Sequence, residues 1–369
     1  ELPLPGSNLA IINVRQTPRT ERCRRIRTGH RQTSMSTRSS TPIARIAHPL
    51  AFGAFLEEIG APVHRHFRRQ GLPFFCNNPD SFVPLRRAWS LFDAASRAED
   101  PALGWHVGRF VGDHNLSDSL LRRLETAPTL YQALKRFIRL ASAESSHLQL
   151  GILERRDDIL FYTNYPDMRN VRGYHAAQAY QLSVYIDLIR HFLGERWVPE
   201  EIGIEHLVVP AVVKEHFPGS RVLPWQRVGF VSVPRDCLHT AAPARQSEST
   251  IDEPVVLTED FSFPDTLAAV IEAYLPDGYP SAKKVAPLMD TSTRTMARRL
   301  VEHGLTYQEL IDKVRFNLAR ELLQEDTMTV ADVGIATGFS NPTHFARMFR
   351  RIGGLSPLEF RKSAQGRAD

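Results

Sequence analysis

Apolar residues recur at helical spacing along a first stretch of the chain, from Pro49 to about Asn115. Residues three or four positions apart lie on one face of a helix, so this spacing predicts amphipathic helices. Two more such helices are expected at about Leu116–Glu125 and Leu130–Ala143. The clearest stripes are formed by Phe52, Phe55, Leu56 and Ile59, and by Leu85, Trp89 and Phe92.

The period changes after residue 147. Two apolar runs, residues 148–154 and 159–163, flank the turn-like sequence Arg155–Asp158, which predicts a β-hairpin. Mixed helices and short strands then predict an α+β domain over residues 49–240. Its later elements are a long helix over Tyr174–Phe192, strands near Ile202–Val209 and Val228–Val233, and a short helix over Val212–Phe217.

Two segments without apolar periodicity flank this domain. Residues 1–48 are rich in Arg, Ser and Thr and are expected to form a disordered basic tail. Within it, Met35 opens a more typical N-terminus, which leaves open whether residues 1–34 belong to the native protein. Residues 241–262 are rich in Ala, Pro, Ser, Gln, Thr and Glu and are expected to be a linker.

The net charge of +5 is unevenly distributed along the chain. Residues 1–48 carry +7, residues 264–369 carry +1, and the stretch between them carries −3. Net charge indicates only non-specific attraction to DNA. Evidence for specific DNA binding therefore has to come from the positions of individual charges on the fold.

Beyond the linker, the sequence reads as a string of capped helices with short turns. Ser281 is placed to cap a helix over residues 282–289, and Ser292 to cap a helix over residues 293–303 that Gly304 ends. The second of these helices has Met296 and Leu300 on its inner face and arginines on its outer face. Two short helices joined by a tight turn predict a helix-turn-helix, in which the second helix enters the major groove of DNA.

The same pattern follows again after a long helix from about Thr306 to Gln324. Thr329 and Asp332 are placed as a capping box, and Asn341–Pro342 as a cap followed by proline at the first helical position. The inner faces of the two helices are expected to hold Val330, Val333 and Ile335, and Phe345, Met348, Phe349 and Ile352.

At these residues the chain resembles the AraC/XylS family of transcriptional regulators. The resemblance covers about residues 264–362 and is most specific in Val330–Phe339, Phe345–Phe349 and Gly354–Pro357. It implies an all-α DNA-binding domain over residues 263–369, with two helix-turn-helix motifs joined by a long helix. The preceding α+β domain resembles, more weakly, the sensor region of a subgroup that includes ornithine-utilisation and virulence regulators. Two departures are Gly334, where the family usually has Ala, and Pro287, inside a helix.

The resemblance also implies which residues meet DNA. Base contacts are expected from Arg294, Arg298, Thr343 and Arg347. Arginine suits this role because its planar fork can bond O6 and N7 of guanine together. Phosphate contacts, which set register without reading sequence, are expected from Ser292, Thr295, Asn341, His344 and Arg350.

The remaining expectations concern partners and chemistry. DNA, RNA polymerase, an unidentified small-molecule effector and a second copy of the chain are the expected partners. No cofactor and no metal are expected, because no nucleotide-binding or nucleophile motif occurs and the three cysteines are isolated. No apolar run approaches the ~18 residues of a membrane span, and the cytoplasm is the expected compartment. An effector pocket is expected among Trp89, Trp105, Phe161, Tyr174 and Tyr180.

Three hypotheses therefore remain. The first is a regulator controlled by a small molecule and not an enzyme. The second is a constitutive DNA-binding protein whose N-terminal domain serves only self-association. The third is an enzyme or a haem or metal sensor with a DNA-binding module attached.

Overall fold

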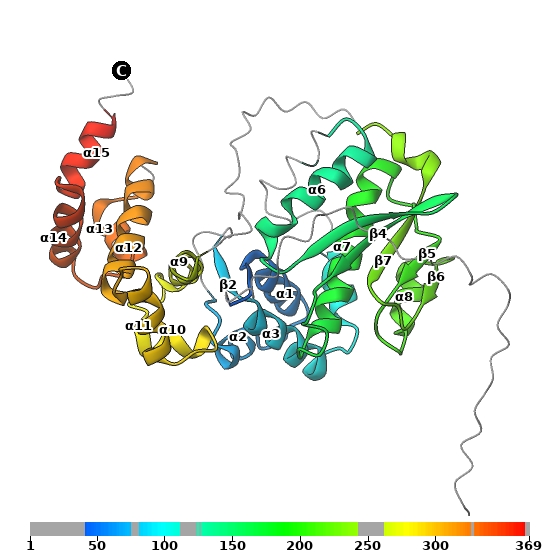
Figure 1. Ribbon diagram of the computed structural model, residues 1–369, viewed down its shortest axis with the longest axis horizontal. Coiled ribbons are helices and arrows are strands. Elements are labelled where there is room, and N and C mark those ends of the chain that lie inside the picture. The colour runs from blue at the N-terminus through cyan, green and yellow to red at the C-terminus, as the bar shows by residue number, and fades with distance from the viewer. Residues whose placement is uncertain are drawn as a thin grey trace, which may run out of the picture. The chain divides into compact units, whose positions relative to one another are not determined.

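The fold is known from a computed structural model that describes residues 41–74, 81–110, 124, 127–242, 262–325 and 328–365 (Figure 1). Most of the tail expected over residues 1–48, most of the helix expected near Leu116–Glu125, and nearly all of the linker lie outside the described residues. The described chain has an α+β region up to residue 242, followed by helices only, as the sequence predicts.

A mixed five-stranded sheet organises the α+β region, with strand order β3-β4-β7-β5-β6. Neighbouring strands are antiparallel except for the parallel pair of β5 and β6. The predicted hairpin is confirmed, since Leu150 pairs with Thr163 in its register. The strand expected over residues 202–209 is shorter, and β6 was not predicted. The strands are β3 (Gln149–Glu154), β4 (Asp158–Asn164), β5 (Glu201–Gly203), β6 (Arg221–Leu223) and β7 (Gly229–Pro234).

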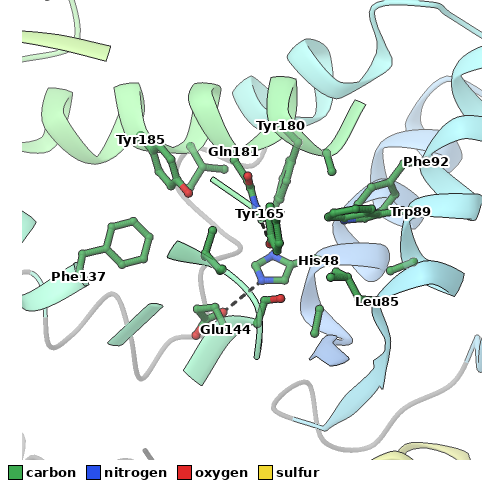
Figure 2. Close-up of a pocket in the computed structure, with 16 residues that line it drawn as sticks. His48, Leu85, Trp89, Phe92, Phe137, Glu144, Tyr165, Tyr180, Gln181 and Tyr185 are labelled. Carbon is green, nitrogen blue, oxygen red and sulfur yellow. Dashed lines mark hydrogen bonds and ion pairs between the residues drawn. The ribbon is translucent and has the colours of Figure 1, made fainter. Parts of the chain in front are cut away.

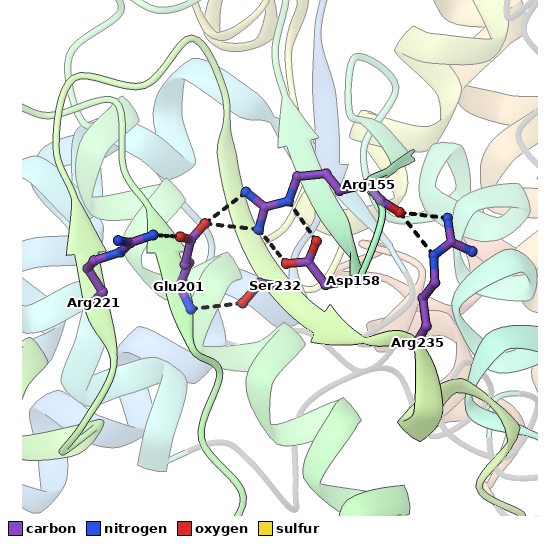
Figure 3. A network of polar contacts seen from close by, with 6 residues as sticks. All are labelled: Arg155, Asp158, Glu201, Arg221, Ser232 and Arg235. Atoms are coloured by element: carbon purple, nitrogen blue, oxygen red, sulfur yellow. Dashed lines mark hydrogen bonds and ion pairs between the residues drawn. The ribbon is translucent and has the colours of Figure 1, made fainter. Parts of the chain in front are cut away.

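A polar network ties the predicted hairpin to the strands that follow it much later in the chain (Figure 3). Arg155, in the hairpin turn, binds Asp158 beside it and Glu201 of β5, the latter at 2.9 Å. Glu201 also pairs with Arg221 of β6, and its backbone N–H donates to Ser232 Oγ of β7 at 2.8 Å. Glu201 therefore connects the hairpin turn with β6 through its carboxylate and with β7 through its backbone N–H, so breaking the network would leave several polar groups unsatisfied together.

Helix α7 (Tyr174–Leu193) packs against both the sheet and helix α4 (Leu103–Phe110). The close approach of α4 depends on two glycines. A Cβ at Gly104 would lie 2.3 Å from the carbonyl oxygen of Ala176, and one at Gly108 would lie 2.3 Å from Ser183 Cβ. A larger residue at either position would push the two helices apart.

The α+β region begins earlier than the predicted boundary at residue 49. Strand β1 (Ile43–Arg45) pairs antiparallel with β2 (Phe82–Pro84), and helix α1 (Ala47–Glu58) follows directly. Arg45 was assigned to the basic tail, but its side chain is buried and its Nε lies 3.2 Å from Glu144 Oε1. The prediction was wrong because a three-residue strand is too short to produce a period-two pattern. The other helices of this region are α2 (Val63–Gln70), α3 (Leu85–Ala98), α6 (Leu130–Glu144) and α8 (Ala211–His216).

The C-terminal region has the predicted order of capped helices. Ser292 and Thr306 accept the backbone N–H three residues on, and Thr306 forms a full capping box with Glu309. Ser281 occupies the cap position of its helix without a side-chain cap bond. The helices are α9 (Phe263–Tyr274), α10 (Ala282–Leu288), α11 (Thr293–Glu302), α12 (Tyr307–Gln324), α13 (Val330–Ala336), α14 (Pro342–Gly353) and α15 (Pro357–Gln365).

Two inner-face predictions were wrong. Ile335 is 64% exposed and Ile352 is 39% exposed. Ile335 lies two positions from the buried Val333, which is about 200° around a helix, so the two side chains cannot face the same way. Pro287 falls in the last turn of α10, so it interrupts little of that helix.

Candidate nucleic-acid interface and sensor cavity

Helices α10 and α11 form the first helix-turn-helix. Met296 and Leu300 of α11 are buried, whereas Arg294 and Arg298 are exposed. These arginines are four residues apart, so they lie on one face of the helix, opposite its buried side. Arg298 Nε lies 3.7 Å from Glu302 Oε1, but both side chains are largely exposed, so this ion pair is weak.

The residues at the start of α11 have a capping role. Thr295 N–H donates to Ser292 Oγ at 3.0 Å, and the two hydroxyls are 2.9 Å apart. The remaining unsatisfied N–H groups of this first turn are suited to an anion such as phosphate.

Helices α13 and α14 form the second helix-turn-helix. Asn341 Oδ1 accepts the backbone N–H of Thr343 at 2.8 Å and so caps α14. Phe345 and Phe349 anchor the helix from its buried side. The side chains expected to meet DNA are all exposed: Asn341, Thr343, His344, Arg347 and Arg350.

Arg315 on α12 joins the two units and was missed from the sequence. Its Nη2 donates to the carbonyl oxygen of Gly338, in the turn of the second unit, at 2.7 Å. Its guanidinium lies 4.8 Å from the ring centroid of Tyr279 and 4.2 Å from that of Phe339. Tyr279 lies just before the first unit, and Phe339 lies in the turn of the second. The buried Arg315 side chain therefore contacts residues beside or within both units. The sequence signal that could have revealed Arg315 was a charged residue within a helical stripe of otherwise apolar residues.

A cavity lies within the α+β region, between α3, α6, α7 and the start of α1 (Figure 2). Of the five predicted effector residues, Trp89 and Tyr180 line it. Trp105, Phe161 and Tyr174 are buried but do not line the cavity, and Trp105 packs on Phe217 instead. The cavity volume is about 40 Å³. The cavity is therefore narrow in this conformation.

Polar side chains meet at one side of the cavity and bind one another. His48 Nε2 lies 3.3 Å from Glu144 Oε2, and His48 Nδ1 lies 3.2 Å from the hydroxyl of Tyr180 (Figure 2). Gln181 Nε2 donates to the hydroxyl of Tyr165 at 2.9 Å. Burial raises the pKa of Tyr165 to about 12 and raises the pKa of Tyr180 further, so both phenols stay neutral at physiological pH.

Helix α3 contacts both the cavity and the DNA-binding region. Leu85, Ala88 and Trp89 line the cavity. On its other side, Arg87 Nη2 donates to the carbonyl oxygen of Pro287 at 2.8 Å, and Arg86 Nε lies 3.5 Å from Asp290 Oδ2. Pro287 and Asp290 belong to the end of α10 and the turn before α11.

Two histidines of the α+β region pair with nearby carboxylates. His66 Nε2 lies 2.9 Å from Glu99 Oε1, and His106 Nε2 lies 3.1 Å from Asp100 Oδ2. No three His, Cys, Asp or Glu side chains in the described ranges lie close enough together to hold a metal ion. Within the same ranges, no helix is both long and apolar enough to cross a bilayer.

Comparison with known proteins agrees with this arrangement. A helix-turn-helix domain family matches residues 285–363, and the family described as the arabinose-binding domain of AraC transcription regulators matches residues 60–218. The two matches lie in the two regions, and the chain is similar to the AraC family of transcription regulators.

The curated relatives are similar over a short stretch. The transcriptional regulator VqsM of Pseudomonas aeruginosa is 37% identical over 89 residues, which is 24% of this chain and 27% of VqsM. The ornithine utilization regulator of the same species is 31% identical over 88 residues, 24% of this chain and 26% of that protein. The transcriptional activator RhaS of an Enterobacter species is 37% identical over 83 residues, 22% and 30% respectively. The matches thus span less than a third of each relative's length.

Among solved structures, the transcriptional regulator CdpR of Pseudomonas aeruginosa is similar over 81% of this chain and 96% of its own. Its sequence identity is 19% and its TM-score is 0.34.

Proposed function

We propose that this protein is a sequence-specific transcription regulator that reads DNA with α11 and α14 and is controlled by a small molecule bound in its cavity. The main observation behind the proposal is that two capped helices, α11 and α14, both have exposed arginines on their outer faces. In each unit a shorter helix braces the exposed one. The similarity to AraC transcription regulators supports the same function.

The residue roles follow from position and side-chain chemistry. Arg294, Arg298, Thr343 and Arg347 contact base edges, because they lie on the outer faces of the two helices that enter the grooves. The contacts to phosphate come from residues at the helix starts and from one basic side chain in the last turn of α14: Ser292, Thr295, Asn341, His344 and Arg350.

The length of α12 determines the type of DNA site. Its 18 residues span ~27 Å at ~1.5 Å per residue. Major grooves on one face of B-DNA recur every ~34 Å, so one chain can place α11 and α14 in successive grooves with some bending of the DNA. One chain then reads an asymmetric site of about two turns. A dimer formed through residues 49–240 reads two such sites, and an activator of this kind also contacts RNA polymerase.

Helix α3 is the route by which the effector acts on DNA binding. Its inner side lines the cavity and its outer side binds the end of α10, so a shift of α3 changes how the first unit is held. A ligand shifts such an equilibrium only as far as its affinity differs between the two states.

The test is binding of the full-length protein to the DNA upstream of its own gene, followed by footprinting. Two protected segments about one helical turn apart are expected. Arg294→Ala combined with Arg347→Ala should abolish the specific footprint, whereas Arg196→Ala, an exposed arginine of the α+β region, should leave it intact. An unchanged footprint in the double variant contradicts the proposed interface. Specific binding that no small molecule alters would favour the constitutive alternative.

A further inference from the structure

We infer that the effector is an uncharged molecule with a flat apolar ring and one hydrogen-bonding end, and not a sugar or a charged amino acid. The inference rests on the proposed role of the cavity as the effector site. It goes beyond the description of the matched family, which names arabinose.

The shape of the ring follows from the walls. Trp89 and Tyr165 stand edge-to-face with their ring centroids 4.9 Å apart, and Phe137 and Tyr185 do the same at 5.6 Å. Phe92 and Tyr180 complete the aromatic lining (Figure 2). Aromatic side chains bind a planar ring by offset stacking and edge contacts.

The single polar end follows from the polar contacts that the lining side chains already make with one another. His48 binds both Glu144 and Tyr180, and Gln181 binds Tyr165. A sugar would have to replace several of these bonds at once, and each buried group left without a partner would cost ~1–3 kcal/mol. One hydroxyl or amide on a ligand can join the cluster without dismantling it.

The absence of charge on the ligand follows from the balance of charges in the cluster. Glu144 is buried, and Arg45 Nε lies 3.2 Å from its Oε1, so this carboxylate already has a cation beside it. A charged ligand would enter an apolar cavity without an opposite charge reserved for it, and such burial is unfavourable.

The narrowness of the cavity links binding to movement. A dry cavity of ~150 Å³ can hold benzene, whereas about 40 Å³ here is open to water centres. A ring therefore fits only when the walls separate. Leu85, Ala88 and Trp89 of α3 form part of those walls, so binding displaces the helix that also holds Pro287.

The experiment uses three probes with the same ring and different charge: benzyl alcohol, benzoate and benzylamine, with L-arabinose and L-ornithine alongside. Binding to the full-length protein is measured by isothermal titration calorimetry. Saturable binding of benzyl alcohol, at least tenfold tighter than that of either charged probe, is expected. Tighter binding of benzoate, benzylamine, arabinose or ornithine would overturn the inference, and so would no binding of benzyl alcohol.

Cavity-filling variants locate the site. Ala88→Leu on α3 should weaken benzyl alcohol binding at least tenfold, whereas Ala98→Leu, the same change at the exposed end of the same helix, should not. Should Ala88→Leu unfold the protein, as judged by circular dichroism, Ala177→Val on α7 fills the cavity from the opposite side. Equal affinity in a folded cavity variant and in the control contradicts the assignment.

A separate measurement distinguishes this inference from the proposed function. Ligand class is judged by binding to the protein alone, and effector control by the change in promoter affinity on adding the same probe. Tight binding of benzyl alcohol without any change in promoter affinity would refute control while leaving the ligand class standing.

Discussion

The two helix-turn-helix units have similar local structure but different support. The first unit shares a continuous apolar core with the α+β region, to which it contributes Val285, Met296 and Leu300. The second has a small cluster of its own, made of Ala319, Leu323, Val333, Phe345, Met348 and Phe349. Helix α12 contributes to both, through Ile311 at one end and Leu323 at the other.

Because the two units are supported by different cores, we expect them to have different roles within the DNA-binding region. Events in the cavity can reach the first unit through packed side chains, because both belong to one core. The second unit is connected mainly through α12 and through the contacts of Arg315. We therefore expect the second unit to hold DNA in a manner independent of the effector, and the first to vary with it.

The largest expected effect is on stability. Phe349→Ala removes the centre of a small cluster and should cost ~3–5 kcal/mol, enough to unfold the second unit while the rest of the chain stays folded. Hydrogen exchange should show loss of protection confined to residues 328–365. Met296→Ala is the matched change in the first unit and should instead lower the unfolding transition of the whole core. A single cooperative transition in both variants would show that the two cores are not separate.

The next effect tests the rigidity of α12. Inserting half a helical turn of DNA between the two protected segments should abolish specific binding, because the second recognition helix would then face the wrong side of the duplex. Inserting a full turn should not restore it, since a helix of ~27 Å cannot stretch. Full recovery with the full-turn insertion, measured by gel shift, would mean that the units are flexibly joined or that only one of them contacts DNA.

A smaller effect separates base contacts from phosphate contacts within α14. Arg347→Ala should cost ~1–3 kcal/mol on the matched site and relax preference at one base pair. Arg350→Ala should weaken all sequences alike and reduce the salt slope by ~0.9. Titrations on matched and mismatched sites at several salt concentrations provide the check. Identical behaviour of the two variants would refute the division of roles.

The smallest effect concerns the contact between α3 and the first unit. Arg87→Ala removes the hydrogen bond to the carbonyl oxygen of Pro287. We expect promoter affinity to change by only a few-fold, because the contact is exposed, but the response to an effector should be reduced. Footprint protection by the first unit should then become insensitive to ligand. Arg97→Ala, at the other end of α3, is the control.

Regular patterns made most of the fold predictable. The hairpin, α7 and the capped C-terminal helices each carry a period or a cap that is visible within a few residues. The short strands β1, β2 and β6 do not, because three residues are too few to establish alternation. The start of the α+β region was misplaced for this reason.

The candidate sites were less evenly predictable. Exposure of Arg294, Arg298 and Arg347 follows from their helical spacing relative to buried neighbours, and the structure agrees with it. The members of the cavity could not be found in this way. His48 and Glu144 lie 96 positions apart in the sequence, and only the folded chain brings them together. Among buried aromatic residues, sequence alone does not separate Trp89, which lines the cavity, from Trp105, which does not.

The narrow cavity also has a kinetic meaning. A ligand that enters only when the walls have separated has its apparent affinity reduced by the fraction of molecules that are open. Its association rate rises with ligand concentration at first and then levels off at the rate of opening, as expected when the conformational change precedes binding. The regulator would then respond to a sudden rise of its effector at a pace set by α3 and its neighbours.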